Sequence, residues 1–182
     1  DCHFHILGGG GEGGFQNRTP EVTLSQLTSA GVTTVVGCLG TDGEGRDMTA
    51  LISKAKGLEA EGITTFVYEG SYRLPVKTVT DSIIKDFLTI DKIIGIGEIA
   101  VSDHRSSQPT FEEFARATAD ARVGGMLSGK AGIVNVHLGG GTRKLELLKK
   151  VVEETEIPIS QFLPTHANRT QELLDACIEF AK

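Results

Sequence analysis

The sequence lacks three features, and each absence excludes a class of protein. No apolar run approaches the roughly 20 residues of a membrane-spanning helix, so no membrane partner is predicted. Basic residues are not in excess: 24 Asp and Glu outnumber 18 Lys and Arg and give a net charge of −6 at pH 7. This balance argues against a nucleic-acid partner. The cysteines Cys2, Cys38 and Cys177 fit no zinc knuckle or redox motif, so we expect three reduced thiols in a cytoplasmic protein.

The composition is that of one folded domain. The chain has 182 residues, of which 39% are hydrophobic and 23% charged, and this is enough for a substantial core. The 23 glycines cluster at 8–14, 37–45, 124–132 and 139–141, which indicates loops at one end of a scaffold. Because no repeat, low-complexity tail or linker divides the chain, we expect residues 1–182 to form a single domain.

Short apolar runs rich in β-branched residues alternate with segments of helical periodicity. Apolar residues recur at helical spacing within 48–58, 111–119 and 145–152. The predicted strands are Cys2–Ile6, Thr34–Cys38, Thr64–Tyr68, Ile93–Val101, Ile133–His137 and Gln161–Thr165. This alternation is typical of about six repeated βα units around a mostly parallel sheet. Six units make either an open doubly wound sheet or most of a (β/α)8 barrel, which typically needs ~250 residues.

The boundaries of the helices have clear signals. The predicted N-caps are Thr19 before Pro20, Thr110 with Glu113 three residues later, and Thr170. Gly31 and Gly62 stand where helix C-caps are needed. The first strand begins abruptly and the last helix ends at Lys182, so we expect the chain to be a piece of a longer protein.

The chain opens with DCHFHILGGGGEGG, in which two histidines lie one residue apart. Residues i and i+2 of a strand point to the same side, so His3 and His5 project together and can hold one divalent metal. Two histidines at this spacing, taken by themselves, are about as often structural residues as metal ligands. Position favours a metal site, because His137 and His166 also lie at or near the ends of predicted strands, where parallel α/β folds bind ligands. The fifth histidine, His104, lies just beyond the fourth strand.

A carboxylate completes this set. Glu98 lies within the fourth predicted strand, in GIGEIA, and a buried carboxylate is costly unless it is paired or bound to metal. The alternative is a strand-end salt bridge to an arginine such as Arg105, and we favour the metal ligand. Two metals held by four histidines and a shared carboxylate would acidify a bridging water and polarise a carbonyl group, which is hydrolytic chemistry.

Several stretches taken together are more specific than the histidine pair. They are DCHFHILGGGGEGG, RTPEV, VVGCLGTDG, GSYRLP, SDHRSSQPT, RVGGMLSGKAG, VHLGGG and LPTHANR, and they extend from the first residues to Arg169. In them the chain resembles the bacterial β-aspartyl (isoaspartyl) dipeptidases of the amidohydrolase superfamily. The resemblance implies a partial (β/α)8 metallohydrolase barrel with two divalent metal ions, most often zinc. The metal ligands it implies are His3, His5, Glu98, His137 and His166.

The same resemblance implies how a dipeptide is held. The substrate-binding residues it implies are Gly10, Glu12, Thr41, Arg105 and Arg169. Glu12 matches the carboxylate that receives the substrate α-ammonium group, and the two arginines match the groups that clamp substrate carboxylates. Tyr72 matches the catalytic residue that hydrogen-bonds the scissile carbonyl oxygen as it becomes anionic. Without the resemblance, we would interpret Tyr72 as a half-buried structural tyrosine and Arg105 and Arg169 as solvated surface charges.

The chain departs from the family pattern in two places. The family bridges its metals with a carboxylated lysine on the fourth strand, but GIGEIAV has none, and Lys92 lies too early. Glu98 is the expected substitute, with a catalytic role as the bridging ligand. The family's catalytic Asp belongs to an eighth strand, and this chain stops after the sixth unit. We therefore expect a barrel whose closing strands are missing and a truncated chain with little or no activity.

The resemblance implies an activity and an assembly. A hydroxide that bridges the metals would cleave β-aspartyl dipeptides, and the full-length protein would be a homo-oligomer. Three alternatives stay open: another amidohydrolase, such as a cyclic amidase or N-acyl amino acid deacylase; a metal-binding fragment without turnover; and a metal-dependent nuclease, which the acidic balance disfavours.

Overall fold

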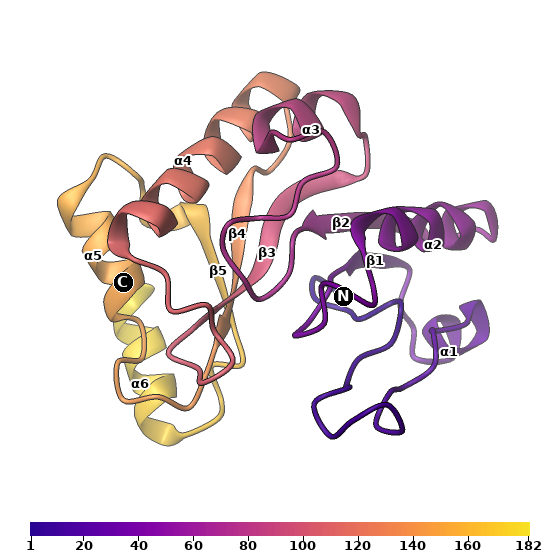
Figure 1. The fold of residues 1–182 in the computed structure, drawn as a ribbon, viewed down its shortest axis with the longest axis horizontal. Helices are drawn as coiled ribbons and strands as arrows, with labels where there is room; N and C mark the ends of the chain where they lie inside the picture. Colours follow the sequence, from indigo (N-terminus) through magenta and orange to yellow (C-terminus); the bar gives the residue numbers. More distant parts are fainter.

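The computed structural model describes all of residues 1–182 as one sheet flanked by helices (Figure 1). The strands are β1 (Thr34–Gly37), β2 (Thr64–Glu69), β3 (Ile93–Val101), β4 (Ile133–Leu138) and β5 (Phe162–Thr165). The helices are α1 (Leu24–Ser29), α2 (Met48–Ala60), α3 (Ile83–Thr89), α4 (Phe111–Ser128), α5 (Glu146–Glu154), α6 (Gln171–Phe180) and the short 3₁₀ turn η1 (Ile159–Gln161). No helix is both long and apolar enough to cross a membrane.

The strand order decides between the two architectures that the sequence left open. All neighbouring strands pair in parallel, and their order in the sheet, β1-β2-β3-β4-β5, is their order in the chain. A doubly wound sheet reverses its order at a switch point, whereas barrel strands follow one another around the axis. The sheet curls and the helices lie along its outer side (Figure 1). The partial (β/α)8 barrel is therefore confirmed.

The first predicted strand differs from the other five. Cys2–Ile6 is not a regular strand, but it lies beside β1 through a single parallel bridge between Phe4 and Gly37. The Phe4 N–H donates to Val36 O at 3.0 Å, and the Cys38 N–H donates to Phe4 O at 2.9 Å. The ladder stops there because the next amides fold back: the Ile6 N–H donates to Phe4 O and the Gly8 N–H to His5 O. The six units are thus five strands and one irregular edge segment.

Most of the predicted helix boundaries are confirmed. Thr110 forms a capping box with Glu113, and Thr170 caps α6. Gly31 and Gly62 follow the C-caps of α1 and α2 with φ angles of +74° and +111°. The prediction of a helix start at Thr19 is wrong, because its hydroxyl accepts a hydrogen bond from the Gly9 N–H at 2.6 Å. The helix begins later, at Leu24, where Thr23 and Gln26 form the capping box.

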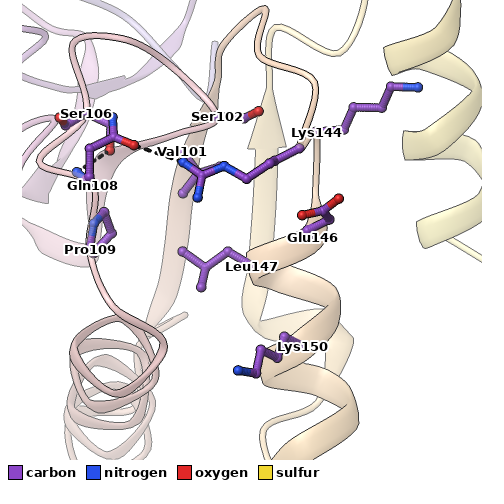
Figure 2. A pocket seen from close by; sticks show the side chains of 10 residues that line it. Val101, Ser102, Ser106, Gln108, Pro109, Lys144, Glu146, Leu147 and Lys150 are labelled. Carbon is purple, nitrogen blue, oxygen red and sulfur yellow. Dashed lines mark hydrogen bonds between the residues drawn. The ribbon is translucent and has the colours of Figure 1, made fainter.

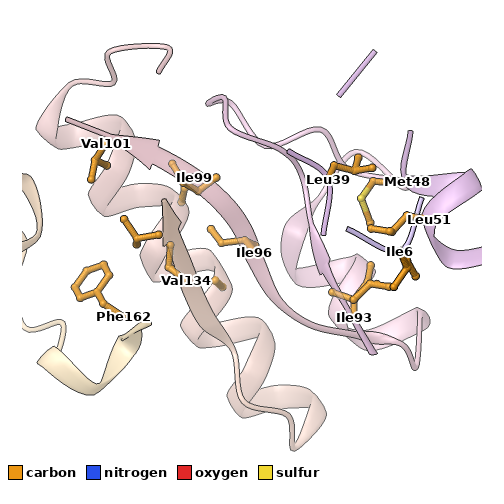
Figure 3. Close-up of a cluster of buried hydrophobic side chains, with 14 of the residues drawn as sticks. Ile6, Leu39, Met48, Leu51, Ile93, Ile96, Ile99, Val101, Val134 and Phe162 are labelled. Carbon is orange, nitrogen blue, oxygen red and sulfur yellow. The ribbon is translucent and has the colours of Figure 1, made fainter. Parts of the chain in front are cut away.

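The core lies in two layers, one on each side of the sheet. The larger layer fills the space between the strands and the outer helices, and Figure 3 shows part of it, including Ile96, Ile99 and Val134. A smaller cluster of Val36, Cys38 and Tyr68 lies on the opposite side. Alternation along each strand sends successive side chains to opposite sides of the sheet. The chemistry-bearing residues project to the side of the smaller cluster.

A bulge in β3 determines where Glu98 points. Ile96 pairs with Val134 and Ile99 pairs with Val136, so β3 has one more residue than β4 between these pairs. Ile96 and Ile99 both face the outer helices, and Glu98 between them faces the interior. Gly97 makes this possible: its φ is +131°, and a Cβ there would lie 2.4 Å from the Asn135 carbonyl oxygen. Bulges commonly redirect a side chain next to a functional site.

Candidate metal centre

Four histidines converge on one buried carboxylate. His3 Nε2 lies 3.3 Å from Glu98 Oε2, and His5 Nε2 lies 3.3 Å from Glu98 Oε1. On the other side, His137 Nδ1 and His166 Nε2 lie 3.0 and 3.6 Å from Glu98 Oε2. Glu98 has no solvent exposure. The structure therefore brings together all five of the predicted metal ligands.

The fold explains why these residues meet. His3 and His5 flank Phe4, which packs on the outer core, so both imidazoles face the interior. His137 lies near the end of β4, and His166 follows β5 directly with a φ of +64°. All of these positions lie at or beside the carboxyl ends of parallel strands, the place where such folds gather ligands.

The donor atoms form two groups that share Glu98. One group contains His3, His5, Cys38 and Glu98, and the other contains Glu98, His137 and His166. Within each group the donor atoms all lie within 4.8 Å of one another. The Glu98 Oε1 and His3 Nε2 atoms are buried without a hydrogen-bond partner, which is costly unless a further ligand is bound. Imidazole and carboxylate donors suit zinc and similar divalent ions, so the residues of both groups fit divalent ions of this kind.

The histidines keep Glu98 ionised. Burial alone would raise the pKa of Glu98, but the neighbouring imidazoles of His137, His166 and His3 hold it well below its usual range. Burial likewise opposes the positive charge on His3, but the nearby Glu98 carboxylate raises the pKa of His3 overall. For His5, burial prevails and lowers the pKa. A negative carboxylate among imidazoles is thus the state of the centre near neutral pH.

Tyr72 and two arginines surround His137. The Tyr72 hydroxyl lies 2.8 Å from His137 Nδ1, and burial and the charge of Glu98 raise the pKa of Tyr72 above its usual range. Arg105 Nη2 and Arg169 Nη2 lie 3.2 and 3.1 Å from the other ring nitrogen, Nε2. All three of these predicted residues therefore border the metal centre. Glu98 is not in a salt bridge with Arg105, so that alternative is wrong.

A second charged group lies beside the centre. Glu12 accepts a hydrogen bond from the Thr41 hydroxyl at 2.7 Å and pairs with Arg105 Nη1 at 2.9 Å. The bond from Thr41, followed by that from Arg105, lowers the pKa of Glu12. His5, Gly10, Glu12, Thr41 and Tyr72 are among the residues that line one cavity, so Glu12 and the predicted metal ligand His5 border the same space.

Three further residues belong to the site and were not predicted. Both carboxylate oxygens of Asp103 accept hydrogen bonds from Arg105, from Nε at 2.9 Å and from Nη2 at 2.8 Å. The bond to Arg105 holds the pKa of Asp103 below its usual range, and its Oδ2 lies 3.2 Å from His137 Nε2. Asn135 Oδ1 lies 3.0 Å from His3 Nδ1, and Cys38 belongs to the first donor group. The position of Asn135 two residues before His137 in a strand was a signal for it.

Other candidate positions lie apart from the centre. His104 is exposed and contacts none of the metal ligands. Lys92 precedes β3 at its far end and pairs with Glu59, so it cannot serve as a bridging lysine. Another cavity lies between the end of β3 and the start of α5, with Gln108 and Lys150 in its walls (Figure 2). None of the predicted site residues lines it.

Comparisons with known proteins agree with this geometry. No family model matches the chain. Two solved structures of a β-aspartyl dipeptidase from the thermophilic, keratin-degrading Fervidobacterium islandicum AW-1 are 60% identical to it, with TM-scores of 0.97 and 0.98. The matches cover 98% and 100% of this chain and 49% of the dipeptidase chain in each case, and one is a complex with β-Asp-Leu. The chain thus spans about half the length of these relatives, and its resemblance to β-aspartyl dipeptidases is confirmed.

Proposed function

We propose that these residues form the metal-binding and substrate-binding part of a zinc-dependent hydrolase that cleaves β-aspartyl dipeptides. The observation that carries the proposal is the convergence of four histidines on Glu98 beside the pair of Glu12 and Arg105. The similarity to a dipeptidase solved with β-Asp-Leu supports the substrate class.

Two divalent ions would be held by the histidines of the two donor groups, with Glu98 as the shared ligand. When bound there, such ions supply an activated water and polarise the carbonyl group under attack. Asn135 accepts a hydrogen bond from His3 Nδ1–H, and the Cys38 carbonyl accepts one from His5 Nδ1–H, at 3.0 and 3.3 Å. These contacts leave the Nε2 atoms of both rings free for metal, which is the usual work of the residues around a metal site.

The pair of Glu12 and Arg105 matches the charged end of an aspartyl residue. A free β-aspartyl residue carries an ammonium group and a carboxylate on one carbon, and the pair presents a carboxylate and a guanidinium 2.9 Å apart. On binding, Glu12 and the Thr41 hydroxyl would turn to the ammonium group, and Arg105 would turn to the carboxylate. The Glu12–Arg105 ion pair would thus be replaced by two ion pairs with the substrate. The contact to Glu12 requires an ammonium group, so substrates with a free amino terminus would be selected.

Tyr72 would act on the scissile carbonyl. Burial raises the pKa of Tyr72 further above neutral pH, so the phenol keeps a proton to donate. Donation to the carbonyl oxygen as it becomes anionic is the work of an oxyanion-stabilising group. Arg169, whose Nε donates to the Leu138 carbonyl at 2.8 Å, keeps its Nη atoms directed toward the site and would hold the carboxylate of the leaving residue.

The remaining parts of the proposal concern the protein around the site. We expect the 182 residues alone to bind metal weakly and turn over little, because a complete barrel supplies groups from more strands. A homo-oligomer of the full-length protein and a cytoplasmic location also belong to the proposal. The cytoplasmic location is supported by the three cysteines, all of which are free thiols.

The test compares β-Asp-Leu, α-Asp-Leu and N-acetyl-β-Asp-Leu as substrates of the intact zinc-loaded protein. We expect strong preference for the first. Glu12→Gln should lower kcat/KM for β-Asp-Leu roughly 10- to 100-fold, the range expected for loss of a charge-assisted hydrogen bond. It should also narrow the preference over the N-acetylated substrate. Glu44→Gln is the matched control, because Glu44 is an exposed carboxylate paired with Lys77.

Two outcomes contradict parts of the proposal. Full activity of Glu12→Gln on β-Asp-Leu removes the ammonium-binding role of Glu12. If neither Asp-Leu isomer is cleaved while zinc is bound, the dipeptidase activity is wrong and the metal centre alone survives.

A further inference from the structure

The Cys38 side chain has no role in the function proposed above, which uses only the backbone carbonyl of this residue. It follows β1 directly and is 1% exposed. Its side chain lies in the inner cluster with Val36 and Tyr68, on the side of the sheet that carries the metal ligands. A cysteine at this depth has two physical uses: it fills space as a small apolar side chain, or its sulfur binds a metal.

The contacts of the sulfur favour binding. Cys38 Sγ belongs to the group of donor atoms, with those of His3, His5 and Glu98, that all lie within 4.8 Å of one another. Two further atoms in this group lack partners. Glu98 Oε1 and His3 Nε2 are buried with no hydrogen-bond partner, and each is satisfied by a cation that the sulfur also reaches.

We propose that the Cys38 thiolate is a ligand of the ion held by His3, His5 and Glu98. This inference rests on the metal centre of the proposed function. It makes the two metal positions chemically different. The position near His3 and His5 offers sulfur and is selective for thiophilic ions, whereas the position near His137 and His166 offers only nitrogen and oxygen. As the sulfur–metal bond forms, the thiol proton leaves to solvent.

Cobalt reports sulfur ligation directly. The metal-free protein is titrated with Co²⁺ under reducing, anaerobic conditions, and the near-ultraviolet sulfur-to-cobalt charge-transfer band is recorded together with the visible bands of bound Co²⁺. The double variant Cys2→Ser/Cys177→Ser leaves Cys38 as the only thiol within residues 1–182, so a band that arises from these residues in it comes from Cys38. We expect the band in the wild type and in the double variant.

A second arm uses Cys38→Ser and compares the binding of two ions. Loss of a soft ligand should lower Cd²⁺ affinity roughly tenfold or more while Mn²⁺ affinity changes little. If the Cys38 side chain only fills space, Cys38→Ser should change the Cd²⁺ and Mn²⁺ affinities equally. The double variant decides the question even if Cys38→Ser fails to fold.

The outcomes separate this inference from the function on which it rests. Visible Co²⁺ bands without a sulfur band in the double variant overturn ligation by Cys38 and leave the metal centre intact. If the wild-type protein binds no Co²⁺, Zn²⁺ or Cd²⁺ at all, the metal centre and the inference are both wrong.

Discussion

A buried pair of carboxyl groups away from the metal centre gives the sharpest prediction for stability. Glu69 ends β2, Asp86 lies on α3, and neither has any solvent exposure. Asp86 accepts hydrogen bonds from the backbone N–H groups of Val79 and Thr80, whereas both Glu69 oxygens lack a donor. Burial, followed by the neighbouring Asp86, raises the pKa of Glu69 to about 10. Burial opposes ionisation of Asp86, but the neighbouring Glu69 and the hydrogen bonds from Thr80 and Val79 lower the pKa of Asp86, so Glu69 holds the proton of the pair.

The sign and size of the effect follow from this proton. In the unfolded chain Glu69 ionises near the ordinary glutamate pKa of 4.5, and in the folded protein its pKa is about 10. Between these values the folded state binds one proton more than the unfolded state, so stability falls as pH rises. The slope is about 1.4 kcal/mol per pH unit, or roughly 3 kcal/mol between pH 6 and pH 8. The contribution is fully present below pH 4.5 and is lost as pH rises through the folded pKa.

Glu69→Gln tests this directly, because glutamine keeps the shape and an N–H donor for Asp86 but does not titrate. Urea unfolding of both proteins is measured at pH 6, 7, 8 and 9 in the presence of a chelator. The stability of the variant minus that of the wild type should grow by about 1.4 kcal/mol per pH unit. Glu153→Gln, at an exposed position on α5, should follow the wild type. If the free energy of unfolding changes with pH equally in Glu69→Gln and in the wild type, the reasoning is refuted.

Two further predictions concern the site. Asp103→Asn removes the charged grip on Arg105, and we expect the KM for β-Asp-Leu to rise roughly tenfold in steady-state kinetics of the zinc-loaded protein; an unchanged KM would show that Arg105 needs no such support. Gly97→Ala places a Cβ 2.4 Å from the Asn135 oxygen at a φ of +131°, and urea unfolding should show a loss of at least about 2 kcal/mol. Gly129→Ala, at a φ of +68° with nothing within 4 Å, should cost about 1 kcal/mol, and equal losses at both positions would contradict this account of the bulge.

The sequence predicted those parts of the site that depend on local periodicity. His3 and His5 are two residues apart in an extended segment, so their common direction follows from the backbone alone. His137 and His166 meet them because the carboxyl ends of neighbouring parallel strands lie together. Thr110 and Thr170 begin their helices because each has its partner amide three residues later along the chain.

Features that depend on contacts far apart in the sequence could not be predicted in this way. Thr19 precedes a proline, which is typical of a helix start. Its hydroxyl instead accepts a hydrogen bond from the Gly9 N–H, on the other side of the glycine-rich loop. Asp103 looks like an ordinary loop carboxylate until the fold places it between Arg105 and His137. The bulge that turns Glu98 inward depends on the fit of Gly97 against Asn135 in the next strand. In each case tertiary contacts overrode the local signal.

The arrangement of charge favours a cation on one side of His137 and an anion on the other. Glu98 lies on the Nδ1 side of the ring, and the guanidinium groups of Arg105 and Arg169 lie on the Nε2 side. Asp103 and Glu12 engage Arg105, so its charge is not available to neutralise Glu98. The carboxylate therefore keeps its negative charge for cations, while the arginines remain within reach of carboxylates. In the function proposed above, the His137 ring would separate the metal ions from the substrate carboxylate, and an anionic dipeptide would lie next to the metals without its carboxylate being one of their ligands.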